Sequence, residues 1–238
     1  MTYCLAIKTH EGLIALADCR ITAGNEVTQA GKLSFVDTIS GHRFFIMTSG
    51  LRSVRDKVVA YVEQEIRNHQ KMETMLDAIG VYTRCLRQVE REDRWRIEQS
   101  GMIFNHHAIV GGYLQKDEQP TLYLVYPEGN WIEVDHRTPF LSIGSTGYGK
   151  PILDRAMKYS TQMDTAIKLA YLSFDSTRLS SADVGFPIDM ATFRNSDKKW
   201  RYTHLEYEDV QQLRDWWSQH IAELVKTSPS SDWMGDLL

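Results

Sequence analysis

The sequence of 238 residues has little cysteine, no long apolar run and no large excess of charge of either sign. Its three cysteines show no C-x-x-C spacing, which favours reduced thiols in a cytosolic protein over a disulfide framework. No stretch approaches the eighteen or more apolar residues of a membrane span, and charged residues interrupt the N-terminal segment too early for a signal peptide. The net charge of −4, with both signs interspersed, argues against nucleic acid and membranes as main partners.

What the chain does contain is typical of a globular protein with a packed core. Apolar residues make up 42% and charged residues 24% of the sequence, and the length suffices for one large domain or two small ones. There is no internal repeat and no interior linker, so we expect a single domain over residues 1–238. The Ser-Pro-Ser-Ser stretch after Thr227 predicts a tail over 227–238 that is flexible or reaches a neighbouring molecule.

Blocks of strand pattern alternate with pairs of helices along the chain. Short apolar runs predict strands at 2–8, 12–18, 32–36, 43–48, 108–113, 121–126, 131–134, 188–193 and 200–205. Apolar residues at helical spacing predict helices from residue 51 onward and at about 73–98, 151–159, 163–174 and 210–224. This order fits the α/β (α+β) class, with two stacked sheets covered by helices on both outer faces, a four-layer α/β/β/α sandwich.

Thr2 is the first candidate for chemistry. Threonine is small enough for a methionine aminopeptidase to remove Met1, and an N-terminal threonine then carries a nucleophilic hydroxyl and a basic α-amine on one residue. That amine has an ordinary pKa of about 7.7–8.0, so near neutral pH it can accept the hydroxyl proton. A retained Met1 would leave Thr2 without a free amine. Many proteins begin Met-Thr, so the hypothesis depends on what lies beside Thr2.

Two charged residues are predicted to fold back onto Thr2. A turn at residues 9–12 joins the first two strands, and a hairpin centred near His10 pairs Thr2 with Asp18. Lys32 opens the third strand and can bring a cation to the same place. Its charge disfavours protonation of the α-amine, while Asp18 holds the Lys32 ammonium. On spacing alone, an ordinary ion pair at two strand ends is an open alternative.

The order of these residues and of several later motifs resembles the proteasome β-subunits. After Thr2 come Leu16-Ala17-Asp18-Cys19-Arg20, Lys32, Thr48-Ser49-Gly50, Val110-Gly111-Gly112 and Gly144-Ser145. Proteasome β-subunits are N-terminal-nucleophile hydrolases with a four-layer sandwich, and the likeness covers essentially the whole chain. Within that family it is strongest to the bacterial ancestral β-subunits, Anbu. The motifs shared with Anbu are Met-Thr-Tyr-Cys at the start, Asp175-Ser176-Thr177 and Val184-Gly185-Phe186-Pro187-Ile188-Asp189.

The resemblance implies a catalytic role for four of the matching residues. Thr2 would be the nucleophile, Lys32 would lower the pKa of its freed amine, and Asp18 would orient Lys32. The backbone N–H of Gly50 would form the oxyanion hole. Such a donor at a helix start is typically worth about 2.7–4 kcal/mol of transition-state stabilisation.

Four further residues receive supporting roles from the same resemblance. Ser145 and Asp175 match the pair that hydrogen-bonds the threonine amine, although Ser145 also fits a helix cap and Asp175 a surface position at a helix end. Thr48 matches a position that lines the pocket for the substrate side chain. Arg20 flanks the active strand and is assigned to the same pocket.

The chain also departs from the family pattern. Three positions after Asp175, where β-subunits have a serine followed by glycines, stands Arg178. The last polar partner of the amine is therefore open between Ser180 and Ser181. No propeptide is visible, so we expect activation to need only the removal of Met1.

Two other features resemble known sites but do not match them. The run Asn105-His106-His107 suggests a metal, but adjacent strand residues point to opposite faces and no third ligand has supporting spacing. The glycine-rich segment 144–150 lacks the spacing of a phosphate loop, and we interpret it as a turn that leads into a helix with Pro151 in its first turn. The sequence thus predicts no metal and no cofactor.

The sequence and the resemblance together predict a threonine-type peptidase subunit of the proteasome class. It would cleave peptides or unfolded proteins in the cytoplasm through an acyl-enzyme on Thr2, as part of a homo-oligomeric ring or open spiral. Two alternatives stay open. One is a catalytically weak or inactive assembly module with the same fold, supported by the lengthened segment after Asp175. The other is a small-molecule amide hydrolase with the same nucleophile.

Overall fold

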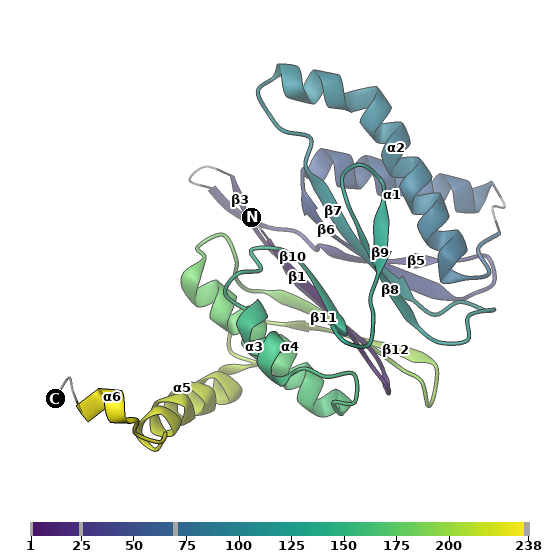
Figure 1. The fold of residues 1–238 in the computed structure, drawn as a ribbon. Coiled ribbons are helices and arrows are strands. Elements are labelled where there is room, and N and C mark those ends of the chain that lie inside the picture. Colours follow the sequence, from purple (N-terminus) through teal and green to yellow (C-terminus); the bar gives the residue numbers. More distant parts are fainter. Residues whose placement is uncertain (1, 24–25, 69–70, 236–238) are drawn as a thin grey trace.

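Two five-stranded antiparallel sheets, stacked face to face, form the centre of the molecule (Figure 1). The computed structural model describes residues 2–23, 26–68 and 71–235. In strand order the first sheet contains β10 (Phe140–Gly144), β1 (Tyr3–Thr9), β2 (Gly12–Asp18), β11 (Ile188–Arg194) and β12 (Lys199–Leu205). The second contains β5 (Leu33–Asp37), β6 (Arg43–Gly50), β7 (His106–Gly112), β8 (Thr121–Val125) and β9 (Trp131–Glu133).

Helices cover both outer faces of the paired sheets. The helices α1 (Arg52–Arg67) and α2 (Met75–Gln99) lie on the second sheet, and α3 (Lys150–Ala156) and α4 (Met163–Ser180) lie on the first. The buried apolar side chains form three clusters, one between the sheets and one under each pair of helices. This is the four-layer α/β/β/α sandwich that the sequence predicts. None of the described helices is long and apolar enough to span a membrane.

The hairpin of β1 and β2 differs by one residue from the predicted register. Thr9 pairs with Gly12 around a two-residue loop, whereas the prediction centred the hairpin on His10. Two-residue loops are the commonest hairpin connection. With two residues in the loop, the centre of the hairpin lies between them and not on His10, so each residue of β1 pairs one position further along β2 than predicted. The predicted pairing of Thr2 with Asp18 is therefore wrong by one position. Their contact is made by the side chains instead.

Three strands lie where the sequence analysis predicts none. Strands β3 (Arg20–Ala23) and β4 (Glu26–Gln29) form a short separate hairpin, and β4 is exposed along its length, so no alternation of apolar residues marks it. Strand β10 has only five residues and pairs with β1 at the edge of the first sheet. Helix α4 continues to Ser180 and therefore holds Asp175 within its length and not at its end.

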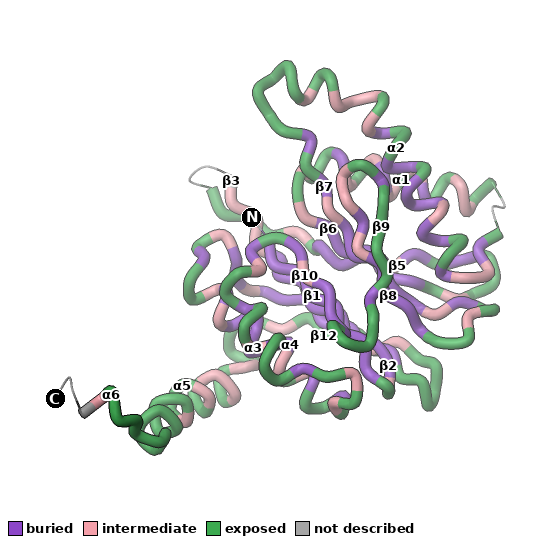
Figure 2. Tube along the Cα trace, viewed as in Figure 1, coloured by how far each residue is buried: buried purple, intermediate pink, exposed green. Residues whose placement is uncertain are grey.

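The C-terminal helices extend away from the sandwich. In Figures 1 and 2, α5 (Gln211–Lys226) and α6 (Asp232–Gly235) project from the side that carries α3 and α4. Leu213 and Trp217 contact the apolar cluster under α3 and α4, but α5 has no buried residue. The large apolar side chains that α5 and α6 expose are Trp216, Ile221, Leu224, Val225 and Trp233. The molecule thus presents several exposed apolar side chains on this helical extension.

Candidate active site

Thr2, Asp18 and Lys32 meet where β1 begins and β2 ends. The Thr2 hydroxyl donates a hydrogen bond to Asp18 Oδ1 at 2.8 Å, and Lys32 Nζ donates to the same oxygen at 2.7 Å. The backbone N–H of Tyr3 is a third donor to that oxygen, at 2.8 Å. Asp18 is completely buried, and Thr2 and Lys32 are 4% and 7% exposed. The structure therefore brings the hydroxyl, the carboxylate and the ammonium into one hydrogen-bonded group.

Lys32 is held from two sides. Besides the carboxylate of Asp18, its Nζ donates to the backbone carbonyl of Arg20 at 2.6 Å. A buried ammonium needs a paired charge and further acceptors to offset its lost hydration. Asp18 supplies the charge and the Arg20 carbonyl supplies an acceptor. The cation is consequently fixed beside the Thr2 hydroxyl.

The end of β10 holds the backbone of Thr2. The N–H of Ser145 donates to the Thr2 carbonyl at 2.7 Å. Gly144 has a φ of +88°, and a Cβ on it would lie 1.9 Å from the same carbonyl oxygen, so the close approach requires glycine. Ser145 Oγ lies 3.5 Å from Ser181 Oγ, and Ser181 is buried whereas Ser180 is exposed. Of the two serines that the sequence leaves open, the structure places Ser181 beside Ser145.

Gly50 ends β6 just before α1. Its φ is +120°, and a Cβ on it would lie 1.9 Å from the carbonyl oxygen of Asn105. Both the backbone conformation and the packing therefore require glycine at this position. Helix α1 starts two residues later, and its N-cap residue, Leu51, makes no side-chain capping hydrogen bond. The first N–H groups of α1 thus lack a side-chain partner at the same end of the sheet.

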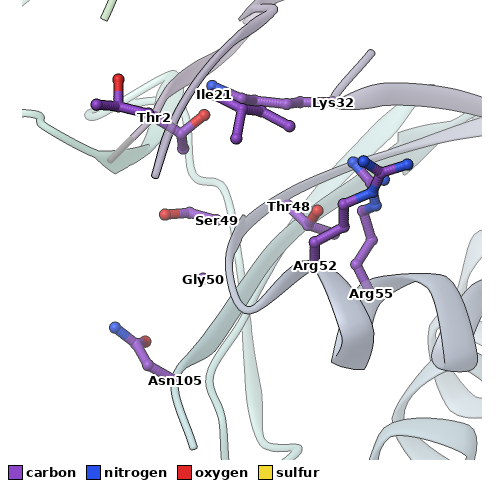
Figure 3. Close-up of a pocket in the computed structure, with 10 residues that line it drawn as sticks. Thr2, Ile21, Lys32, Thr48, Ser49, Gly50, Arg52, Arg55 and Asn105 are labelled. Atoms are coloured by element: carbon purple, nitrogen blue, oxygen red, sulfur yellow. The ribbon is translucent and has the colours of Figure 1, made fainter. Parts of the chain in front are cut away.

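A cavity of about 300 Å³ opens in front of Thr2 (Figure 3). It is lined by Thr2, Ile21, Thr22, Lys32, Thr48, Ser49, Gly50, Arg52, Arg55 and Asn105. Thr48, which the resemblance assigns to a substrate pocket, is in this lining. The candidate nucleophile, the candidate oxyanion-hole residue and a space for a ligand therefore share one cavity.

Arg20 occupies a different place from the predicted one. Its Nη1 donates to the carbonyl of Ala182 at 3.0 Å, and its guanidinium packs against Gly185. The side chain thus lies against the loop between α4 and β11, and it does not belong to the cavity lining. Its contribution to the site is its backbone carbonyl, which accepts from Lys32.

Asp175 is likewise engaged by partners that the sequence analysis does not assign to it. The carboxylate is buried in α4, and its Oδ1 forms an ion pair with Arg178, with a distance of 2.6 Å to Nη2. The Tyr171 hydroxyl is a weaker donor to the same oxygen, at 3.4 Å. The Arg178 guanidinium also stacks over the rings of Phe186 and Tyr207. The substitution of Arg178 for the family's serine thus gives Asp175 a charged partner within its own helix.

Comparisons with known proteins show the family of the chain. The family model described as "Proteasome subunit" matches residues 2–193. The chain belongs to the proteasome subunit family. It is 25% identical over 202 residues to proteasome subunit beta 1 of Pyrobaculum calidifontis, a match that spans 83% of this chain and 92% of that protein.

Solved structures of Anbu are similar over nearly the full length of the chain. An Anbu (Gly-1) mutant from Hyphomicrobium sp. strain MC1 has 30% identity and a TM-score of 0.88, covering 98% of this chain and all of the other. The helical assembly of the Anbu complex from Pseudomonas aeruginosa has 28% identity and the same TM-score, covering 96% and 98%. Anbu from Yersinia bercovieri has 25% identity and a TM-score of 0.85, covering 97% and 99%. The resemblance found in the sequence is confirmed.

In this proteasome-family chain, six residues of the cavity lining are not among the predicted site residues: Ile21, Thr22, Ser49, Arg52, Arg55 and Asn105. Arg52 and Arg55 lie in the first turn of α1, and Asn105 precedes β7. The available signal is the spacing of the two arginines, because residues three apart share a face of a helix. Their position directly after Gly50 places that face at the cavity.

The two adjacent histidines lie in different environments, as expected for neighbours on a strand. His106 is completely buried, and its Nε2 lies 2.8 Å from the Tyr82 hydroxyl. Burial lowers the pKa of His106 to about 4, with the nearby charges of His107 and Arg55 acting in the same direction. The His106 imidazole is therefore neutral near neutral pH and supports β7 behind Gly50, its partner on β6.

One group of metal-ligand types does occur among the described residues, and none of its members lines the cavity. Ligand atoms of Cys19, Asp189 and His204 all lie within 4.8 Å of one another. Cys19 Sγ and His204 Nδ1 lie 3.2 and 2.7 Å from the Asp189 carboxylate, which also accepts from the Tyr202 hydroxyl. Burial raises the pKa of the Cys19 thiol, so the thiol keeps its proton and donates it. Hydrogen bonds alone thus account for this arrangement.

Proposed function

We propose that this chain is a threonine-type peptidase subunit that cleaves peptide bonds through an acyl-enzyme on Thr2. The observation that carries the proposal is the shared oxygen of Asp18, which holds the Thr2 hydroxyl and the Lys32 ammonium together at a cavity. Nucleophilic catalysis by an N-terminal threonine needs a positioned hydroxyl, its own α-amine as the base, and a cation that keeps this amine neutral. Membership of the proteasome subunit family supports the same reaction class.

In the proposed reaction the α-amine of Thr2 is freed by removal of Met1, a residue that lies outside the described part of the chain. The amine accepts the hydroxyl proton while the oxygen attacks the carbonyl carbon of the substrate. The N–H of Gly50 stabilises the negative oxygen of the tetrahedral intermediate. The C–N bond then breaks, the proton passes to the leaving amine, and an ester on Thr2 remains. Water, deprotonated by the same amine, hydrolyses the ester and restores Thr2.

Lys32 acts in this scheme through its charge. A second cation close to the ammonium costs electrostatic energy in a poorly solvated site, so the α-amine is driven toward its neutral, basic form. Asp18 holds the Lys32 ammonium in place. The Ser145 N–H holds the Thr2 carbonyl, and the Ser145 hydroxyl lies 3.5 Å from that of Ser181.

The test is the intact mass of the purified protein before and after incubation with a β-lactone that acylates N-terminal threonine. We expect a species without Met1 that gains one inhibitor mass, and no gain for Thr2→Ala. The matched control is Thr165→Ala, which removes a hydroxyl at an exposed position of α4 outside the cavity lining and should still be labelled. A free Thr2 that stays unlabelled, or labelling that persists in Thr2→Ala, contradicts the proposal.

A second proposed function is assembly into a homo-oligomer. The exposed apolar side chains of α5 and α6 favour it, since such residues suit the buried centre of an interface. The Pseudomonas aeruginosa relative is described as a helical assembly, which supports the same behaviour here. We expect Leu224→Glu to lower the particle mass measured by light scattering. Glu223→Ala, at the neighbouring exposed position, should leave it unchanged, and an equal effect of both would contradict a role for the apolar face.

A further inference from the structure

The cavity in front of Thr2 is lined by an unusual number of cations. Lys32, Arg52 and Arg55 contribute to it, and the rest of the described lining consists of uncharged residues. Lys32 is neutralised by the buried carboxylate of Asp18 at 2.7 Å. The two arginines therefore decide the net charge that a substrate meets there.

The two arginines share one carboxylate. Arg55 Nη2 lies 2.8 Å and Arg52 Nε 3.3 Å from Asp56, whose side chain is 54% exposed. Two guanidinium groups against one carboxylate leave an excess positive charge. Arg52 carries the more available of the two guanidinium groups, since its side chain is 64% exposed.

Arg55 is held by more contacts than Arg52 and is far less exposed. Arg55 Nη1 donates to the carbonyl of Gly31 at 2.9 Å, and its side chain is only 15% exposed. Figure 3 shows the two guanidinium groups side by side at the end of the cavity near Lys32, with Thr2 across from them. An anion placed between Thr2 and α1 would meet both groups.

The helix itself adds to this charge. Arg52 begins α1, a helix of 16 residues with no acidic residue in its first turn and no side-chain cap. The N-terminus of a helix carries a partial positive charge and open N–H donors, which favour anions. Two independent features, the arginine pair and the helix end, therefore present positive potential to the same space.

We propose that this cavity is a subsite for an acidic side chain, so that the preferred substrates carry aspartate or glutamate on the acyl side of the cleaved bond. The inference rests on the proposed function, because that function places the cleaved peptide bond of the substrate next to Thr2. When the substrate carbonyl accepts from the Gly50 N–H, it lies at a position two residues along the chain from Arg52. The side chain of the substrate residue that carries this carbonyl then enters the space next to Arg52 and Arg55. Guanidinium and carboxylate groups match in geometry and form paired, charge-assisted hydrogen bonds.

Binding to the Thr2→Ala variant tests the subsite without requiring turnover. Three fluorescent peptides would be identical except for a glutamate, glutamine or lysine at the residue that precedes the cleaved bond. We expect the glutamate peptide to bind about tenfold more tightly than the glutamine peptide, a discrimination typical of one good contact, and the lysine peptide to bind most weakly. The preference should shrink as salt is raised, because screening weakens the attraction.

Two second-site variants make the assignment specific. Arg52→Glu should abolish or reverse the preference for glutamate over lysine, whereas Arg67→Glu, at the exposed far end of the same helix, should preserve it. Equal affinity for the three peptides, binding of none of them, or an unchanged preference in Arg52→Glu overturns the inference. β-Lactone labelling of Thr2 in the wild-type chain reports separately on the proposed function. Labelled protein without a charge preference would refute the subsite alone.

Discussion

Lys32 Nζ lies 2.7 Å from Asp18 Oδ1, and neither side chain is more than 7% exposed. Breaking a buried ion pair leaves one charge without compensation, which typically costs about 3–5 kcal/mol, although replacing both partners with apolar groups is often neutral. An isolated exposed pair contributes little by comparison. The burial of this pair therefore sets it apart from the exposed ion pairs, and the loss of one partner should be costly.

The first prediction concerns the stability of that pair. Lys32→Met should lower the free energy of unfolding by about 3–5 kcal/mol, because Asp18 remains buried and unpaired. The double variant with Asp18→Asn should recover much of the loss. Chemical denaturation measures all three proteins. The control is Arg43→Ala, which breaks an exposed pair with Asp37 and should cost less than about 1 kcal/mol. Equal costs for Lys32→Met and Arg43→Ala would contradict the prediction.

The second prediction concerns Gly50. Gly50→Ala should abolish β-lactone labelling of Thr2 and destabilise the fold, since the new Cβ meets the Asn105 carbonyl at 1.9 Å and φ is +120°. Gly41→Ala is the matched control. Gly41 also has a positive φ, of 79°, but nothing lies within 4 Å of its Cβ position. It should cost only about 1–2 kcal/mol and leave labelling intact. A labelled, stable Gly50→Ala protein would contradict the requirement for glycine here, since alanine keeps the backbone N–H and only the new Cβ tests the close contact.

The approach of Thr2 and Asp18 could be predicted from the sequence because it depends on the pattern of two strands and the turn between them. Two apolar runs joined by a short turn must place their outer ends together, whatever the precise register. The register itself depends on whether the loop contains an even or odd number of residues, and local composition does not settle that. The contact survives the one-residue error because the side chains of Thr2 and Asp18 reach each other across the strand ends.

The other features of the site depend on tertiary packing. Arg52 and Arg55 have the spacing of a solvated helix face, and only the placement of α1 after Gly50 brings them to the cavity. The partner of Asp175 follows from the length of α4, which continues past the predicted end and carries Arg178 with it. Strand β10 positions Ser145, but this short segment is recognised as a strand only from its pairing with β1 in the folded sheet.

The third prediction concerns the ion pair of Asp175 with Arg178. Arg178→Met should lower the free energy of unfolding by about 3–5 kcal/mol, because Asp175 is buried and keeps only the long hydrogen bond from Tyr171. The rate of Thr2 labelling should stay near that of the wild type under conditions where the variant is fully folded. Denaturation and labelling kinetics are both needed. Slow labelling of a fully folded variant would instead show that this pair acts on the nucleophile.

The fourth prediction concerns the pH dependence that His106 imposes. Burial lowers the pKa of His106 in the folded protein to about 4, from an ordinary value of 6.5. Between these values the unfolded chain binds the proton and the folded chain does not, so the stability falls as the pH is lowered from about 6.5 to about 4. The loss from this group approaches about 3 kcal/mol. His106→Gln should have a lower free energy of unfolding at pH 7, but it should lack the decrease that His106 causes between about pH 6.5 and 4. His107→Gln, which changes the half-buried neighbour, should retain most of that decrease. Parallel slopes for the wild type and His106→Gln, measured by urea denaturation across that range, would show that the buried imidazole is not the titrating group.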